Sequence, residues 1–379
     1  QPREEAEDAV EGRPPAEKED EEIAESTLPA EKPVPEERIS PLTPWTIYRY
    51  IFRSAEDGWN PVHKNGVPVL LFYDIDANGY NDVFALFVDR PDEKDAELST
   101  ISDFSRLYDP DIEPFSVQLR MFYQYEGMLH AGYIVDLGKK LVIDEMKQFF
   151  ISKTVKTPFS LYINFQIPEG TERTWIFWQK DAFQTLTLRE TFAAFIDIQD
   201  INGDSFKDIL HFEKSFEAGM GYETYITWYS WNSASYIQRN VTNIVRNLHQ
   251  FLDTTRDYLV NNSWDNLLSH GLQPQQLKLL RKRKISEAEV LQSLFIPSTS
   301  ENGSENPELI DLQIENVIFP EILENPFQRD INGNYIFPLR VRVIAEDGEY
   351  LYIARIGMKK NPFQPQQFYF IVMNENVYN

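Results

Sequence analysis

Oxygen-bearing side chains recur at alternate positions in two nine-residue segments of this chain. The first segment carries Asp74, Asp76, Asn78 and Asp82, and the second carries Asp200, Asn202, Asp204 and Asp208. Ca²⁺ takes roughly six to eight oxygen ligands, and alternate residues of a tight loop can all point toward one ion. The backbone carbonyl groups of Tyr80 and Phe206, at position 7, would add a ligand to each loop. Three carboxylates in one turn also repel one another unless a cation lies between them. We therefore predict two calcium sites, with an ordinary acidic turn as the alternative.

Both segments lie between apolar runs that are typical of β-strands. The runs are 67–73 and 83–88 around the first segment, and 192–198 and 209–212 around the second. Each loop is therefore expected to join two neighbouring strands. Position 6 favours glycine because the backbone is left-handed there, and the first segment has Gly79 where the second has Ser205. An EF-hand is excluded, because its loop needs a glutamate at position 12, where these segments have Ala85 and His211.

The two segments resemble the calcium loops of FG-GAP or VCBS repeats, the integrin-type β-propeller family. The shared pattern is an apolar strand, D-x-[DN]-x-[DN]-G-x-x-D and a second apolar strand, and it covers about 20 residues of each copy. The resemblance implies side-chain ligands at positions 1, 3, 5 and 9 of each loop. It also implies propeller-like hairpins with Asp-rich loops.

A third acidic motif covers 330–334, with the sequence Asp-Ile-Asn-Gly-Asn. It follows the second segment at nearly the interval that separates the second segment from the first. Its positions 6 and 9 are Tyr335 and Pro338, which are poor ligands. We therefore predict a plain Asn-Gly hairpin turn here, with a third repeat as the alternative.

By composition the chain divides into three parts. Residues 1–44 form an acidic, proline-rich tail, 45–238 a β-rich domain with both loops, and 239–379 an α+β domain. Within the β-rich domain, the pattern predicts a hairpin of 159–167 with 174–179 and a strand over 222–231. Short helices are predicted at 103–108 and 141–152. The expected fold is thus mainly antiparallel β, followed by amphipathic helices and a final antiparallel sheet.

The last part of the chain changes its hydrophobic period to that of helices. Apolar residues at i, i+3, i+4 and i+7 predict amphipathic helices within 240–295, and 297–307 has the composition of a linker. Strands are predicted over 309–373, where 339–345 and 350–356 should form a hairpin across Asp347-Gly348. The basic run 281–284 is predicted to be solvated helix surface, with a binding patch as the alternative.

The charge and cysteine content exclude several classes of protein. The 379 residues include no cysteine, which excludes disulfides and thiolate metal sites, and the net charge of −24 disfavours nucleic acid as a partner. Residues 1–40 hold 14 acidic residues against five basic ones, a net charge of −9, so they are expected to be extended and disordered. No apolar run reaches the length that spans a bilayer.

Calcium loops of this kind favour a location outside the cytosol, because they fill only at about 10⁻⁴ to 10⁻³ M calcium. The chain begins with Gln1 and not with Met, so we expect that an N-terminal segment has been removed. The tail would suit a tether, as in a bacterial lipoprotein, and a merely solubilising tail is the alternative. We therefore expect a periplasmic or cell-surface protein that meets a membrane only through a removed N-terminal anchor.

No enzyme motif is recognisable, and neither catalytic residues nor an organic cofactor is predicted. The five histidines lie at no metal-ligand spacing: His63, His130, His211, His249 and His270. The carboxylate pair of a glycoside hydrolase cannot be chosen among 60 acidic residues, because the separation that defines it is spatial. The aromatic residues around Trp175 and Trp228 are predicted to pack in the core, with a stacking platform as the alternative.

Three functions therefore stay open. The first is a noncatalytic, calcium-stabilised β-rich protein for adhesion or assembly, with a protein or a glycan as its partner. The alternative is a carbohydrate-active hydrolase that uses carboxylates in a β cleft. The third is an assembly module whose helices within 240–295 dock a partner. The sequence does not determine the oligomeric state.

Overall fold

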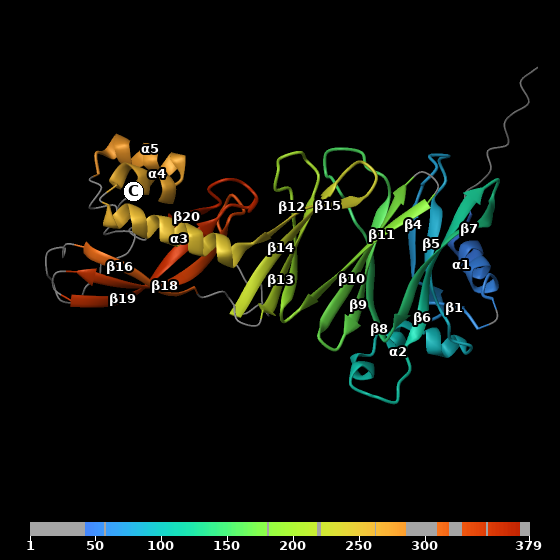
Figure 1. The fold of residues 1–379 in the computed structure, drawn as a ribbon. Helices are drawn as coiled ribbons and strands as arrows, with labels where there is room; N and C mark the ends of the chain where they lie inside the picture. The colour runs from blue at the N-terminus through green and yellow to red at the C-terminus, as the bar shows by residue number, and fades with distance from the viewer. Residues whose placement is uncertain are drawn as a thin grey trace, which may run out of the picture. The chain divides into compact units, whose positions relative to one another are not determined.

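The computed structural model of this protein describes residues 42–371, except 57, 180–181, 218–220, 262, 286–308, 318–327 and 346–347. The fold is mainly antiparallel β, as predicted. Its strands form three larger open sheets and one two-stranded ribbon (Figure 1), and the described strands form no propeller. The predicted tail lies outside the described residues except for 42–44, and a helix already begins at Pro44.

The first sheet holds the first acidic loop and has the order β1-β5-β6-β7, with β4 beside β5. Its strands are β1 (Asn60–Pro61), β4 (Leu70–Tyr73), β5 (Asp82–Val88), β6 (Phe115–Tyr125) and β7 (Met128–Lys140), and β2 (His63–Lys64) pairs with β3 (Val67–Pro68) in the ribbon. Strand β5 is buried over its whole length. Its alternate side chains face two apolar clusters, one shared with helix α1 and the other with the second sheet.

Helix α1 (Pro44–Arg53) was not predicted, because its aromatic and β-branched residues are typical of strands. Thr43 caps the helix through a bond from Thr46 N, and Pro44 occupies the first turn, where a missing N–H costs little. Ile47 and Ile51 lie one turn apart and pack against β5. The capping signals and this packing outweigh the strand propensity.

Three short helical segments connect β5 to β6: η1 (Glu93–Ala96), α2 (Leu98–Ile101) and η2 (Phe104–Leu107). Segment η2 confirms the short helix predicted at 103–108, as a 3₁₀ turn. The helix predicted at 141–152 is wrong, because β8 (Val142–Gln148) is a strand there. Tertiary contacts decide the conformation of this segment. Strand β8 pairs with the next strand, and Ile143 is buried in the apolar cluster between the first two sheets.

Eight antiparallel strands follow one another in chain order in the second sheet (Figure 1). They are β8, β9 (Ser160–Ile167), β10 (Gly170–Gln179), β11 (Ala182–Thr191), β12 (Ala194–Gln199), β13 (Asp208–Glu217), β14 (Gly221–Trp231) and β15 (Tyr236–Asn243). The β9–β10 hairpin and strand β14 confirm two predictions. Gly170 needs to be glycine, because its φ is 151° and a Cβ atom would lie 2.0 Å from the Glu190 carbonyl oxygen.

The helices predicted within 240–295 are α3 (Ile244–Val260), α4 (Trp264–Gly271) and α5 (Pro274–Arg283). The first begins at Ile244 and not at 240, because β15 continues to Asn243. The rest of the predicted helical region and the linker at 297–307 lie outside the described residues. None of the described helices is long and apolar enough to cross a membrane.

The final antiparallel sheet is also confirmed, with the order β16-β18-β19-β20 and β17 beside β18. Its strands are β16 (Leu309–Val317), β17 (Gln328–Arg329), β18 (Tyr335–Ala345), β19 (Gly348–Met358) and β20 (Phe368–Ile371). The predicted hairpin is β18–β19, in which Ala345 lies opposite Gly348. Its turn residues, 346–347, lie outside the described part of the chain.

The apolar clusters join these sheets side by side. One cluster contains Leu210 and Phe212 of β13 together with Leu248 of α3 and Tyr335 of β18. The predicted aromatic core is confirmed for Trp175, which is fully buried on the other face of the second sheet. The second acidic loop therefore begins and ends on strands that the core holds from both sides.

Candidate metal centres

The two acidic segments are equivalent turns between paired strands. The first loop (74–82) joins β4 to β5, and Tyr73 lies opposite Asp82. The second loop (200–208) joins β12 to β13, and Gln199 lies opposite Asp208. Both loops therefore connect neighbouring antiparallel strands in the same register, as the flanking apolar runs predicted.

The backbone follows the same path in both loops. Positions 4 and 6 are left-handed in each: φ is 60° at Ala77 and 86° at Gly79, and 81° at Gly203 and 73° at Ser205. Glycine thus occupies position 6 in the first loop and position 4 in the second. Ser205 adopts the left-handed conformation that position 6 requires, at a cost that glycine would avoid.

Four hydrogen bonds from the backbone to side chains are also common to the two loops. In the first loop, at 2.8–3.1 Å, they link Gly79 N to Asp74, Asn78 N to Asp76, Tyr80 N to Asn78 and Ile75 N to Asp82. In the second loop, at 2.9–3.0 Å, they link Ser205 N to Asp200, Asp204 N to Asn202, Phe206 N to Asp204 and Ile201 N to Asp208. The N–H group donates and the side-chain oxygen accepts in every case. An oxygen that accepts one such bond retains a second lone pair for a cation.

The carboxylates at position 9 are buried and reach a third strand. Asp82 is 0% and Asp208 is 1% exposed. The second oxygen of Asp82 accepts a bond from Gln124 N on β6 at 3.0 Å, and that of Asp208 accepts one from Trp228 Nε1 on β14 at 2.8 Å. No spacing within either segment indicates Gln124 or Trp228, because each comes from the strand beyond the loop.

The pKa of Asp82 is raised to about 6, mainly by burial and also by the charges of Asp76 and Asp74, which together outweigh the two backbone hydrogen bonds. Burial likewise raises the pKa of Asp208 to about 6, with Asp204 and Asp200 acting in the same direction. Each loop therefore concentrates negative charge around a carboxylate that has lost most of its contact with water. A cation held by these groups would relieve both effects.

The carboxylates converge more closely in the first loop than in the second. Asp74, Asp76 and Asp82 each offer an oxygen within 4.8 Å of the others. The three carboxylates of the second loop lie at positions 1, 5 and 9, and they form no such group in the described part of the chain. The sequences differ in the same place: the first loop has Asp at position 3 and Asn at position 5, and the second loop has the reverse.

The third motif is the hairpin turn that its Asn-Gly sequence predicted. It joins β17 to β18, where Arg329 lies opposite Tyr335, so its turn is shorter than the two loops. The Asp330 carboxylate accepts bonds from Asn332 N at 2.8 Å and from Asn334 N at 2.9 Å. Gly333 has a φ of 80°. This turn has neither the length of the two loops nor the set of four hydrogen bonds that the two loops have in common.

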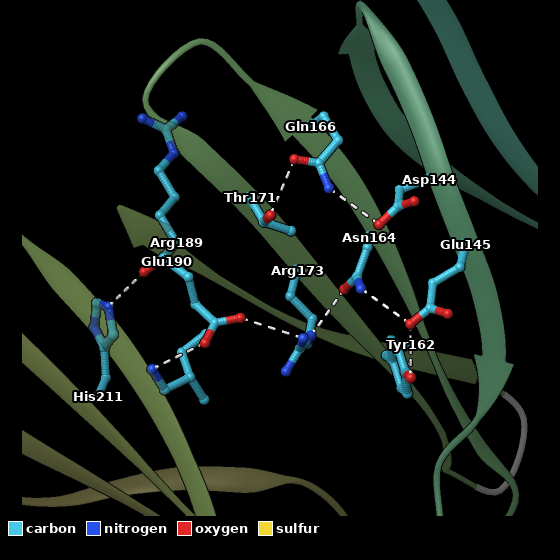
Figure 2. Close-up of polar contacts among 11 residues, drawn as sticks. Asp144, Glu145, Tyr162, Asn164, Gln166, Thr171, Arg173, Arg189, Glu190 and His211 are labelled. Atoms are coloured by element: carbon cyan, nitrogen blue, oxygen red, sulfur yellow. Dashed lines mark hydrogen bonds and ion pairs between the residues drawn. The ribbon is translucent and has the colours of Figure 1, made fainter. Parts of the chain in front are cut away.

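Carboxylates on the face of the second sheet belong to a paired polar network (Figure 2). Glu145 accepts bonds from Tyr162 and Asn164, and Arg173 binds Asn164 at 2.8 Å and Glu190 at 3.2 Å. Burial raises the pKa of Glu145, but hydrogen bonds from Lys147 and Tyr162 outweigh burial and hold that pKa below its usual value. The general acid of a glycosidase needs a raised pKa. The network therefore links strands β8 to β11 and does not resemble a catalytic pair.

The fold and the loops define an open antiparallel β protein with two equivalent Asp-rich turns. The chain matches no protein-family model, no curated protein and no solved structure. The function of the loops must therefore follow from their own geometry and chemistry.

Proposed function

We propose that this chain is a noncatalytic, calcium-stabilised β-rich protein that serves binding or assembly outside the cytosol. The observation that carries the proposal is the repetition of one turn, with the same left-handed positions and the same four hydrogen bonds. In both copies this turn buries a carboxylate beside two others. Such a concentration of charge is unfavourable without a counter-ion, and a hard divalent cation with oxygen ligands offsets it.

In the first loop, Asp74, Asp76, Asn78 and Asp82 would supply side-chain oxygens, and Tyr80 its carbonyl oxygen. Asp200, Asn202, Asp204 and Asp208 would do so in the second, with the carbonyl oxygen of Phe206. Because Asp82 and Asp208 also bind a third strand, an ion at either loop would connect three strands. Its binding free energy would add to the stability of the fold as RT ln(1 + [Ca²⁺]/Kd).

A location outside the cytosol belongs to the same proposal, because loops of this kind need about 10⁻⁴ to 10⁻³ M calcium. The acidic, proline-rich residues 1–40 would act as a tether that carries the folded body away from an envelope membrane. A rigid β body held in this way suits adhesion to a protein or a glycan.

The proposal is tested by calorimetric titration of the metal-stripped chain with CaCl₂ to about 1 mM, together with melting curves in calcium and in chelator. We expect two binding events and a melting temperature that rises with calcium. Asp76→Asn should weaken the first event and Asp204→Asn the second. Asp257→Asn, on the exposed side of α3, is the matched control and should leave both intact. Absence of binding heat, together with equal melting temperatures in calcium and chelator, would contradict the proposal.

A further inference from the structure

A cleft of about 750 Å³ lies where the connection before β6 and the end of β7 meet strands of the second sheet. This volume falls within the range of small-molecule sites, roughly 300–1,000 Å³. Its charged lining residues are the cations Arg106, Lys139, Lys140 and Arg189 and the acids Asp109 and Glu172. The chain as a whole carries a net charge of −24, so this positive surplus opposes the general charge of the protein.

One carboxylate is shared by two of these cations. Glu172 pairs with Lys140, and it also accepts a bond from Arg189 Nε at 3.0 Å. Burial raises the pKa of Glu172, but the hydrogen bonds and charges of Lys140 and Arg189 outweigh burial and hold that pKa below its usual value. The carboxylate is therefore ionised near neutral pH and neutralises only one of the two positive charges.

Two of the cations, Arg189 and Lys139, are open to solvent. The Arg189 side chain is 64% exposed, and its guanidinium group points away from the polar network of the sheet (Figure 2). Lys139 is exposed and has no ion-pair partner among the described residues. Lys139 can therefore meet a ligand directly, and Arg189 can do so through its Nη groups while Nε keeps its bond to Glu172.

Arg106 lies at the same cleft and has an unsatisfied donor. Its Nε donates to the Leu141 carbonyl oxygen at 2.9 Å, and its guanidinium carbon lies 5.5 Å from the centre of the Phe115 ring. Its Nη2 is buried and has no acceptor in the described part of the chain. Because Nη2 is enclosed by the protein, Arg106 contributes positive charge to the cleft, and Nη2 itself does not reach a ligand there.

The rest of the lining is largely apolar, with contributions from Pro110, Ile112, Pro114, Leu141 and Ile167. Tyr108 adds an aromatic ring that is 77% exposed. We propose that this cleft binds an amphipathic organic anion, a molecule that joins a carboxylate, sulfonate or phosphate group to an apolar body. The oxyanion would meet Lys139 and Arg189, and the body would lie on the apolar wall. This inference rests on the binding role proposed above and not on calcium.

The test uses 8-anilinonaphthalene-1-sulfonate, a fluorescent amphipathic anion, and N-phenyl-1-naphthylamine, which has the same rings without the sulfonate. Each probe is titrated into the full chain, in calcium and in chelator. We expect one saturable site for the sulfonate, weakened by NaCl because exposed charges are screened. Equal affinity for the neutral probe would overturn the inference, because the cations would then contribute nothing.

Charge variants locate the site. Lys139→Gln should weaken binding of the sulfonate about threefold, and Lys139→Gln with Arg189→Gln about tenfold. Glu172→Gln removes the competing negative charge and should strengthen binding about threefold. The matched control is Arg281→Gln with Lys282→Gln on the exposed face of α5, which should change nothing. An equal loss in the control pair would overturn the inference.

Melting curves show whether the variants fold, and Lys139→Gln alone suffices if the Arg189 variant does not. Displacement of the probe by octanoate or by octyl phosphate then distinguishes a carboxylate from a phosphate ligand, and either supports the inference. Equal displacement by the neutral octyl glucoside would count against it. Because calcium is measured separately, loss of the calcium sites with an intact cleft, or the reverse, shows which proposal has failed.

Discussion

Asp82 and Asp208 occupy the same place in two turns of different sheets. Each carboxylate accepts the N–H of the second residue of its loop, and each binds a donor on the strand beyond. Strands β4-β5-β6 and β12-β13-β14 thus carry one arrangement twice. Because the two turns have the same backbone path and the same four hydrogen bonds, the effect of a change in one loop can be compared with the unchanged loop.

The first prediction is that the effect of Asp76→Asn on the free energy of unfolding differs in sign between chelator and calcium. Asp76 lies beside Asp74 and Asp82, so removing its charge relieves repulsion in the metal-free loop, and asparagine already occupies this position in the second loop. In chelator we expect the free energy of unfolding to stay constant or rise by about 0.5 kcal/mol. With calcium at about 1 mM the same variant should be less stable than the wild type, because a charged carboxylate ligand is replaced by a neutral amide that binds calcium more weakly. Urea unfolding under both conditions measures this, and the same sign in both would contradict a calcium site.

The second prediction concerns Trp228→Phe. The change removes the Nε1 donor to Asp208 but keeps an aromatic ring against Phe363, whose ring centre lies 5.5 Å away. Loss of a hydrogen bond to a charged group should lower the free energy of unfolding by about 1–3 kcal/mol. Calcium affinity should fall at the second loop only. Titration calorimetry and urea unfolding measure the two effects, with Trp45→Phe, at an exposed residue, as the control.

The third prediction is that Ser205→Gly stabilises the protein. Ser205 has a φ of 73°, a conformation that is unfavourable for residues with a Cβ atom. Glycine should raise the free energy of unfolding by about 0.5–1 kcal/mol, even after its greater freedom in the unfolded chain is counted. Ser105→Gly in η2 is the control and should destabilise, because Ser105 is helical. The two variants are compared by their denaturant midpoints. A loss of stability in Ser205→Gly would contradict the proposed backbone strain at Ser205.

The fourth prediction is a pH dependence from His270. Burial lowers the pKa of His270 below its usual value of 6.5, although the Phe251 carbonyl oxygen, 3.1 Å from Nε2, acts in the opposite direction. As the pH falls through 6.5 the unfolded chain takes up a proton that the folded side chain does not, so the contribution of His270 to stability falls in this window. His270→Gln should remove this loss, so the variant should gain stability relative to the wild type as the pH falls from about 7.5 to about 5.5. Urea midpoints measure the slope, and His249→Gln, at an exposed residue, should leave it unchanged.

Local patterns predicted much of this fold correctly. Apolar runs on each side of the acidic segments identified the strand pairs β4–β5 and β12–β13, because a strand-loop-strand unit is contiguous in the chain. The alternation along 222–231 and the helical period after 240 were equally reliable. The prediction at 141–152 was wrong, because the short segment is compatible with both periods and pairing with β9 decides its state.

The sequence by itself determined the order of oxygen-bearing residues in each loop, the hairpin at 330–334 and the alternation of strands and helices, since these depend on spacing along a continuous backbone. Only the tertiary structure decided that Asp82 and Asp208 are buried, that Gln124 and Trp228 bind them, and that cations from distant segments line one cleft. These relationships join residues of different strands. The distances between them depend on how the strands pair and the sheets pack, and the spacing of residues along the chain does not determine this.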